Sequence, residues 1–440
     1  MRQGKFFRLT VSVSGAGIVT SVPAGIRCPS TCSASFPQNT QVTLKESPDA
    51  NNSFASWSGA CSGSGACSLM LNSADSVTAN FSGSGSGARV YVSGAMNNSG
   101  SQVYAFNAAS NGQLTSVSGS PFSAAVGLQA GTSQFLFGTD HTNIFSFAVA
   151  SDGSISQVST INAEQYNNPA NCGGGPDYLF LDRSGSTLYD LDLYSDCANN
   201  GYQSFGLNTM TGALTYLSLT SDVSPVFESA LTFTGDNTFA FSASCYHYYQ
   251  EIYGFARNSG GTLTLVTNLG QGASLPLAPG GNPYCPWLAS ADNANHLAIS
   301  LTPMNGSTFQ PSGPPVLGAF TVDDSGNPTT TNTSDNMPQV ATTIVNDLRM
   351  SPDGKFLAVG GTGLQVFNFN GADPITQLTG LLITDTIDQL RWDANDNLYA
   401  IGNASGTLHI FNVSAAGAVQ TQGSPYAVTS PQSLVVVPQS

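Results

Sequence analysis

VYAFNAASNGQL, residues Val103–Leu114, is the stretch that decides the fold. A short apolar strand ends near Phe106, a polar turn contains Gly112, and the apolar Leu114 follows two residues later. Repeats of this kind, with short strands and glycine turns every 40 to 65 residues, predict the blades of a β-propeller. The unit recurs six more times along the chain, with its phenylalanine at Phe147, Phe205, Phe255, Phe320, Phe367 and Phe411.

A second repeated pattern precedes the phenylalanine unit and reads as strand, tight polar turn and strand. Examples are LRMSPDGKFLAVGG (348–361) and LRWDANDNLYAIGN (390–403). Each repeat therefore contains four strands, a to d, except the first, which lacks strand a. The C-terminal stretch Ser433–Val437 is a spare strand that can fill this gap in the innermost position. We predict an all-β fold, with a seven-bladed β-propeller over residues 88–440 closed by the C-terminal strand.

A small β-rich domain is predicted before the propeller, over residues 1–81. Apolar and polar residues alternate in Leu9–Gly15 (LTVSVSG), as in a half-buried strand, and four weaker segments of the same kind follow. This pattern predicts five or six strands, with Trp57 as a core residue. The stretch Ser82–Gly87 (SGSGSG) has the composition of a flexible linker.

The composition excludes several classes of partner. Charged residues make up 8% of the chain, against about a quarter in ordinary globular domains. The net charge of −15, without a basic cluster, disfavours nucleic acids and anionic membranes. No apolar run is long enough to span a bilayer. A surface of Gly, Ser, Thr and Asn is typical of an extracellular or cell-surface protein, and we expect a secretion leader upstream of MRQGKFFRLT, which has no apolar core.

Eight cysteines predict disulfides and an oxidising compartment. Their three- and five-residue spacers do not match zinc sites, so neither a metal nor another cofactor is expected. In the first domain, Cys28, Cys32, Cys61 and Cys67 allow three pairings, and short local loops are each worth about 2–3 kcal/mol. In the propeller we predict Cys172–Cys197 and Cys245–Cys285, because all four residues fall on long loops of the same face.

That face carries the b–c loops and the d–a connectors, which are the long loops of this chain. Tyrosine and tryptophan supply a large contact area with a polar tip, which suits glycans or protein partners. The alternative is that these aromatic residues only cover one another. The candidate binding residues are Tyr166, Tyr178, Tyr194, Tyr246, His247, Tyr248, Tyr249, Tyr284, Trp287 and Phe309.

Two arginines occupy matching places on strand a, which lines the central channel of a propeller. Arg349 and Arg391 lie next to Asp347 and Asp388. Such arginines could bind a carboxylate or polarise a lactone. The favoured interpretation is a repeated ion pair between blades. The segment Asp393–Asn397 (DANDN) begins like a calcium loop but aligns with an ordinary turn of the repeat.

Two resemblances to known families follow from these motifs. The run Phe54–Gly63, with FxxW and SGACSG, and the paired cysteines resemble the divergent internalin-type B-repeats of bacterial surface proteins. This resemblance covers the first domain and implies a spacer or display role. SPDGKFLAV (351–359), GSPF (119–122) and GSPY (423–426) resemble the seven-bladed lactonase-like and YVTN-repeat propellers of bacteria over residues 88–438.

The second resemblance implies the propeller fold, but its catalytic cluster cannot be matched residue by residue. The chain's four histidines lie at different positions of different blades: His141, His247, His296 and His409. No catalytic residue is therefore predicted, because a fold alone does not imply an activity.

We predict a non-enzymatic extracellular or cell-surface protein with a structural or binding role. It would associate with itself, as in a filament, or with another surface protein or a glycan. The segment Met1–Arg8 could pair with a neighbouring subunit as an added strand. The alternatives are a lactonase-like enzyme acting on a sugar lactone and a carbohydrate-binding propeller.

Overall fold

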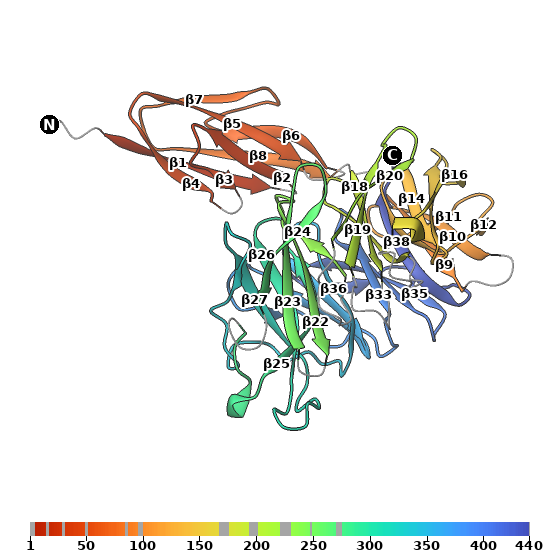
Figure 1. The fold of residues 1–440 in the computed structure, drawn as a ribbon. Helices are drawn as coiled ribbons and strands as arrows, with labels where there is room; N and C mark the ends of the chain where they lie inside the picture. Colours follow the sequence, from red (N-terminus) through yellow and green to blue (C-terminus); the bar gives the residue numbers. More distant parts are fainter. Residues whose placement is uncertain are drawn as a thin grey trace. The chain divides into compact units, whose positions relative to one another are not determined.

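The computed structural model describes residues 5–14, 17–28, 31–48, 52–83, 87–95, 100–166, 176–192, 201–220, 230–246, 249–269 and 275–439. Strands dominate these residues, and the helical segments among them are two single 3-10 turns, η1 (Glu164–Tyr166) and η2 (Pro279–Gly281). The chain divides close to Gly85 into two compact units, which are described separately (Figure 1).

The first unit consists of two four-stranded sheets. One apolar cluster, which includes Leu9, Trp57, Val42 and Leu71, draws side chains from both sheets, so the sheets pack face to face. Eight strands form, more than the five or six predicted. The first sheet has the order β4 (Ser33–Pro37), β1 (Phe6–Ser14), β8 (Asp75–Gly83) and β6 (Asn52–Gly59), and the second β3 (Arg27–Cys28), β2 (Gly17–Val22), β5 (Thr40–Pro48) and β7 (Cys67–Leu71).

The N-terminal segment corrects one expectation. Strand β1 begins at Phe6, and Phe6, Phe7 and Arg8 pair with Pro37, Phe36 and Ser35 of β4 in the same chain. Residues 6–8 therefore do not form a free tail for a neighbouring subunit. Residues 1–4 lie outside the described residues.

The described part of the second unit forms seven consecutive antiparallel sheets, each built from one sequence repeat. In each sheet the strands follow chain order from the inside outward, apart from the first, whose innermost strand is C-terminal. The first three sheets contain β38 (Pro431–Pro438), β9 (Ala88–Gly94), β10 (Ser101–Ala108), β11 (Leu114–Ser116) and β12 (Phe122–Ala124); β13 (Leu128–Gly131), β14 (Phe135–Thr139), β15 (Asn143–Val149) and β16 (Ile155–Asn162); and β17 (Pro176–Leu181), β18 (Thr187–Asp192), β19 (Gly201–Leu207) and β20 (Leu214–Thr220).

The other four sheets repeat this arrangement. The fourth contains β21 (Thr232–Phe233), β22 (Phe239–Tyr246), β23 (Tyr249–Arg257) and β24 (Leu263–Leu269), and the fifth β25 (Tyr284–Ala291), β26 (His296–Pro303), β27 (Val316–Val322) and β28 (Pro328–Thr329). The sixth contains β29 (Val345–Met350), β30 (Phe356–Gly361), β31 (Gly363–Asn368) and β32 (Thr376–Gln377), and the seventh β33 (Gln389–Trp392), β34 (Asn397–Gly402), β35 (Thr407–Ser414), β36 (Gly417–Gln420) and β37 (Tyr426–Ala427).

The C-terminal strand closes the ring of sheets. Strand β38 pairs antiparallel with β9, from Pro431↔Gly94 to Pro438↔Ala88, in the innermost place predicted for it. Its neighbours on either side are the inner strands of the second and seventh sheets, β13 and β33. The last strand of the chain thereby completes the first sheet, whose other strands come from the start of the repeat region.

The phenylalanine and glycine of the repeat unit have distinct structural roles. Each of the seven phenylalanines lies on the third strand of its sheet and is buried. The glycine lies in the turn to the fourth strand and packs against the preceding sheet. At Gly112, where φ is +79°, an added Cβ would lie 2.9 Å from Asn397 Oδ1 of the seventh sheet. The same close approach recurs at Gly153 beside Arg89, Gly212 beside Phe135, Gly261 beside Thr187 and Gly326 beside Phe239.

Side-chain acceptors link successive inner strands around the channel. Gln129 Oε1 of β13 accepts the Leu179 amide of β17 at 2.9 Å, and Gln389 Oε1 of β33 accepts the Leu434 amide of β38 at 2.9 Å. These bonds join an inner strand to the inner strand of the next sheet, which the ladder of its own sheet cannot do. Equivalent links run from Ala291 to Thr232, Met350 to Ser290 and Leu390 to Asp347, and the Leu128 amide bonds Ser93 on the second strand of the first sheet.

Three disulfides are present among the described residues. Cys28–Cys32 and Cys61–Cys67 close short loops in the first unit, which is one of the three pairings left open. Cys245–Cys285 connects the fourth and fifth sheets of the second unit, as predicted. Cys172 and Cys197 lie outside the described residues, so their predicted bond stays a prediction.

Within the described ranges, neither 3-10 turn approaches the length and apolar character of a membrane-crossing helix.

Candidate functional site

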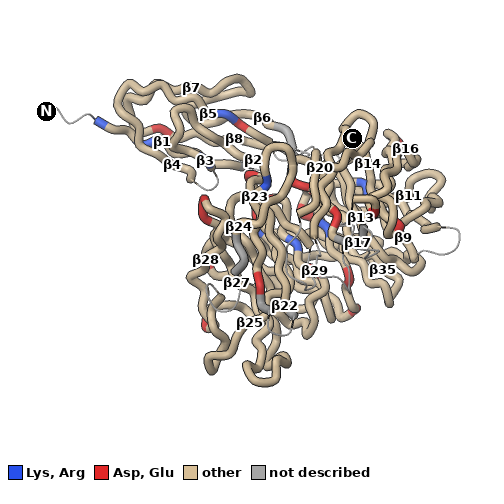
Figure 2. Tube along the Cα trace, viewed as in Figure 1, with Lys and Arg blue, Asp and Glu red and all other residues tan. Residues whose placement is uncertain are grey.

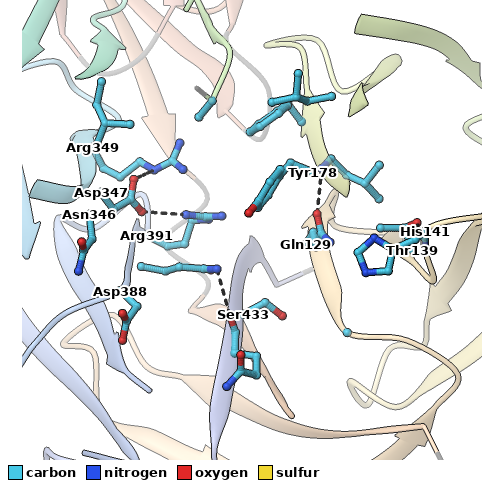
Figure 3. A pocket seen from close by; sticks show the side chains of 18 of the residues that line it. Gln129, Thr139, His141, Tyr178, Asn346, Asp347, Arg349, Asp388, Arg391 and Ser433 are labelled. Carbon is cyan, nitrogen blue, oxygen red and sulfur yellow. Dashed lines mark hydrogen bonds and ion pairs between the residues drawn. The ribbon is translucent and has the colours of Figure 1, made fainter. Parts of the chain in front are cut away.

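A cavity of the second unit lies between the inner strands of the sheets. It has a volume of about 690 Å³ and is lined by residues of β13, β17, β25, β29, β33 and β38 and of the segments beside them. Arg349 and Arg391 both face it (Figure 3). The sequence analysis placed both arginines on the channel wall, and this is where they lie.

Bulges in the inner strands shape this wall. The pairing register shifts by one residue in the inner strands of five sheets, at Gln129, Asp177, Trp287, Asn346 and Gln432. A bulge re-aims a side chain and interrupts the alternation of a strand. Gln129, Asn346 and Gln432 line the cavity as a result. No sequence pattern predicts these bulges, because a strand with one extra residue cannot be distinguished in the sequence from a regular strand.

Asp347 is the centre of the polar network on one side of the cavity. Its Oδ1 forms an ion pair with Arg349 Nε, 2.9 Å away, and its Oδ2 accepts a hydrogen bond from Arg391 Nη1 at 3.4 Å. The same carboxylate accepts the Leu348 amide at 2.9 Å and, across to the next inner strand, the Leu390 amide at 2.8 Å. One buried carboxylate therefore joins the sixth and seventh sheets, which is the ion pair between blades favoured by the sequence.

Arg391 is held in an unfavourable electrostatic environment. Burial, and then the charge of Arg349, lower the pKa of its guanidinium, while Asp347 raises it. Arg391 Nη1 also donates to the Leu390 carbonyl at 2.7 Å. About a quarter of the side chain remains exposed, on the cavity side. Arg391 is therefore fixed by its own strand and can offer a ligand only the remaining part of its guanidinium.

The opposite wall contains neutral polar and aromatic groups. Tyr178 and His141 lie across the cavity from the arginines (Figure 3). The His141 backbone has φ of +69°, and its amide donates to Thr139 Oγ1 at 3.1 Å. The cavity thus combines two arginines, two aspartates, amides and a tyrosine, with no net excess of either charge.

The structure separates the predicted aromatic residues into three groups. Tyr178 and Trp287 are exposed, at 52% and 47%, and lie at the inner strands. Tyr284 is 2% exposed and packs in a core cluster, and Tyr166 stacks on Tyr216 with ring centroids 4.1 Å apart. For these two the alternative of mutual packing is correct.

The side chains of most of the remaining predicted residues are not described. Phe309 is half-buried, with φ of +54°. Tyr246 and Tyr249 lie at the paired ends of β22 and β23, and their side chains are not described. Tyr194, His247 and Tyr248 lie outside the described residues.

Three exposed aliphatic residues were missed by the sequence analysis. Leu277, Ile344 and Leu381 are 60%, 57% and 42% exposed and belong to d–a connectors, on the same face as Tyr178 and Trp287. We call these five residues the mouth rim. A signal for the three aliphatic members was present in the sequence. Each is an apolar residue in a connector, outside the alternating apolar positions of a strand.

A Ser/Thr, His and Asp constellation occurs beside the cavity, but its geometry is not that of a nucleophile activated by a base. His409 Nε2 contacts both Thr407 Oγ1, at 3.0 Å, and Asp385 Oδ2, at 3.2 Å. An activated nucleophile requires the hydroxyl and the carboxylate on opposite ring nitrogens. Burial lowers the pKa of His409, although Asp385 raises it in part. The contact therefore fastens the connector containing Asp385 to the seventh sheet.

The calcium-like segment forms a turn, as interpreted from the sequence. Asp393 and Asn397 bracket the connection between β33 and β34. Asp393 accepts the Asn395 and Asn397 amides at 2.8 and 3.0 Å and the Tyr399 hydroxyl at 2.9 Å, and burial raises its pKa. In the described part of the chain, no three His, Cys, Asp or Glu side chains are grouped so as to hold a metal ion.

Comparison with known proteins supports both parts of the architecture. The divergent InlB B-repeat domain family matches residues 9–85, which lie in the first unit. This match supports the resemblance to bacterial surface repeats. A search of curated proteins found no match.

Several solved structures that resemble this chain are lactonase-like β-propellers. A proposed 6-phosphogluconolactonase from Bacteroides uniformis shares 15% identity, covers 80% of this chain and 100% of its own, and has a TM-score of 0.57. A periplasmic gluconolactonase from Pseudomonas aeruginosa has 15% identity, coverages of 80% and 99%, and a TM-score of 0.57. A proposed 6-phosphogluconolactonase from Bacteroides fragilis has 18% identity, coverages of 81% and 99%, and a TM-score of 0.55. At these identities the likeness establishes the β-propeller fold and nothing about activity.

Proposed function

We propose that this is a non-enzymatic extracellular or cell-surface protein, with a structural or binding propeller and a display module in front of it. The observation that carries the proposal is that polar residues of the channel are engaged in hydrogen bonds and ion pairs with the protein itself. The carboxylate of Asp347 holds two arginines and two backbone amides, and Asp388 Oδ2 accepts the Asn403 amide at 2.7 Å. Asp347 and Arg391 are thus engaged in joining two inner strands, and Asp388 is engaged within the seventh sheet.

The first unit supports a location outside the cell. Its match to the divergent InlB B-repeat domain and its two disulfides are both compatible with a bacterial surface protein in an oxidising environment. A membrane-impermeant amine reagent applied to intact cells of the native host should label the chain, because Lys355 keeps 72% of its side chain exposed. Labelling only after lysis would contradict the proposed location.

A lactonase-like activity is the second candidate, because a cavity of about 690 Å³ brings Arg349 and Arg391 to its surface. Hydrolysis of D-glucono-1,5-lactone and its 6-phosphate should be measured for the wild type, for Arg349→Ala and Arg391→Ala, and for Lys355→Ala as an exposed control. We expect every rate of lactone hydrolysis to equal the spontaneous rate in buffer without protein. Turnover by the wild type that is lost in both arginine variants and kept in Lys355→Ala would establish the enzyme instead.

A further inference from the structure

The distribution of charge between the two units is strongly unequal. Residues 1–85 contain five basic and three acidic residues, a net charge of +2, whereas residues 86–440 contain six basic and 23 acidic residues, a net charge of −17. Figure 2 marks the charged residues of the described part of the chain. A molecule with two oppositely charged parts can attract a second copy of itself when unlike parts face each other.

Basic and apolar side chains gather at one end of the first unit. The Gln38 amide bonds the Lys5 carbonyl at 2.8 Å, and the Asn39 amide bonds the Leu71 carbonyl at 2.9 Å. One turn therefore brings together the start of β1 and the end of β7. We call the exposed residues at this end the distal tip, and they are Lys5, Phe6, Arg8, Val22 and Met70.

The distal tip holds the large exposed apolar residues of this unit. Phe6, Met70 and Val22 are 63%, 55% and 54% exposed, and no other large apolar side chain described in this unit is comparably exposed. Val22 belongs to the same end because it pairs with Thr43, near the start of β5. Elsewhere the outer sheet faces carry Ser, Thr and Asn. Phe6 lies on the outer face of the first sheet, and Val22 and Met70 lie on the outer face of the second, so both faces of this end are apolar. Exposed apolar residues at one end of a domain mark an interaction site.

The distal tip lies far from the linker to the propeller. Strands β1 and β8 run parallel, with Leu9 opposite Asp75, so β8 starts near the tip and ends at Gly83. Eight steps along a strand span roughly 26 Å. A partner bound at the tip is therefore held at the end of the first unit opposite the end of β8.

The mouth rim of the propeller offers a matching surface. Its five exposed residues, Tyr178, Leu277, Trp287, Ile344 and Leu381, belong to the long-loop face. The connectors of this face also carry Glu164 and Asp335, which are exposed, and Asp385, which is half-buried and paired with His409. The rim is thus apolar and acidic where the distal tip is apolar and basic.

The basic residues of the propeller do not neutralise this acidity. Arg89 bonds Asn107 and the Ser151 carbonyl, Arg257 pairs with Asp182, and Arg349 and Arg391 share Asp347. Lys355 is exposed but is paired with Asp353. The excess negative charge of the second unit is therefore presented to partners, and a basic, apolar surface complements it.

We propose that the distal tip of one copy docks on the mouth rim of a second copy, so that the protein associates head to tail. This inference rests on the proposed structural role. Two different surfaces meet, so the contact is heterologous and continues into an open chain unless the rotation closes a ring. Trp287 and Phe6 are the expected anchors, because large aromatic side chains dominate interface energies.

The test is sedimentation velocity of the full chain up to about 100 µM, above the micromolar-to-picomolar affinities typical of standard interfaces. In low salt we expect species that grow with concentration beyond a dimer, and their loss when salt screens the exposed charges. A tip variant (Phe6→Ser with Met70→Ser) and a rim variant (Trp287→Ser with Ile344→Ser) should each remain monomeric. The matched control is Met210→Ser with Val419→Ser, which removes residues 87% and 71% exposed outside both surfaces and should associate like the wild type.

Mixing the two defective variants gives the sharpest result. Each retains one intact surface, so an equimolar mixture should form a single heterodimer and nothing larger. A wild type that stays monomeric, a closed symmetric dimer, or unchanged association of either variant would overturn the inference. So would cosedimentation of a monomeric wild type with phosphatidylserine vesicles, since the tip would then serve a lipid surface. Lactone turnover alone would overturn the proposed function and leave head-to-tail association standing.

Discussion

Asp347 shows how a single side chain can hold a propeller together at its centre. Its two oxygens accept hydrogen bonds from the Leu348 amide, the Leu390 amide and Arg391, and they form an ion pair with Arg349. A carboxylate can accept about four hydrogen bonds, and this one is used close to that capacity. Because both arginines lose their common partner if the charge is removed, the cost of losing Asp347 exceeds that of one hydrogen bond.

We expect Asp347→Asn to lower the free energy of unfolding by about 2–3 kcal/mol, since it weakens charge-assisted bonds and leaves two partly buried guanidiniums without a counter-ion. The matched control is Asp324→Asn, the same change at an exposed turn residue, which should stay within about 0.5 kcal/mol. Urea unfolding followed by tryptophan fluorescence measures both. Equal effects of the two substitutions would show that the network around Asp347 carries little stability.

At the scale of the element, the turn between the third and fourth strands is also the contact to the preceding sheet. Gly112 combines a φ of +79° with an approach that leaves no room for a Cβ beside Asn397 and Ile410. The turn of the first sheet thereby rests on the seventh, and the residue that marks the repeat in the sequence is also a contact that closes the ring. The same residue serves local conformation and tertiary packing, which explains its regular recurrence.

Gly112→Ala should destabilise the propeller by about 1–3 kcal/mol, because alanine is strained at positive φ and its methyl group must displace the neighbouring sheet. Gly380→Ala is the control, since that glycine has ordinary φ and an open surrounding. Thermal unfolding of the two variants should show a lower midpoint for the first only. A midpoint for Gly112→Ala equal to that of the wild type would mean that the contact between the first and seventh sheets yields freely.

At the scale of the whole molecule, the two compact units are stabilised by different means. The first is small, with a single apolar cluster, and carries two disulfides over short loops. The second distributes its core over seven clusters between sheets and is closed by a strand from the C-terminus. Small domains depend on cross-links more than large ones do, because they bury a smaller fraction of their surface.

Reduction of the disulfides should therefore affect the first unit more than the second. Loops of this length are worth about 2 kcal/mol each, so the two bonds together stabilise the first unit by about 4 kcal/mol. Calorimetry should show two transitions, and the one assigned to the first unit should disappear or move down strongly after reduction. Replacement of all four of its cysteines by serine should reproduce this shift, and a single transition unaffected by reduction would contradict the two-unit description.

The sequence by itself determined the class of fold. The buried phenylalanines, the turn glycines and the spare strand Ser433–Val437 obey local rules of period and turn conformation, and such rules are legible in one chain. The place of the cysteines in the repeat, on the long-loop face, likewise predicted Cys245–Cys285. Strand boundaries in the first domain were less legible, because short strands rich in Ser and Gly lack a strong alternation, and β1 therefore extends to Phe6.

Only the tertiary structure decided which of the candidate residues can meet a partner. Tyr166 and Tyr284 are as aromatic as Tyr178 and Trp287, but the first pair fills gaps between strands and the second pair remains exposed. The bulges of the inner strands, the four bonds at Asp347 and the gathering of Phe6, Val22 and Met70 at one tip depend on which strands lie side by side. Exposure and proximity are properties of the packed chain, and no local pattern encodes them.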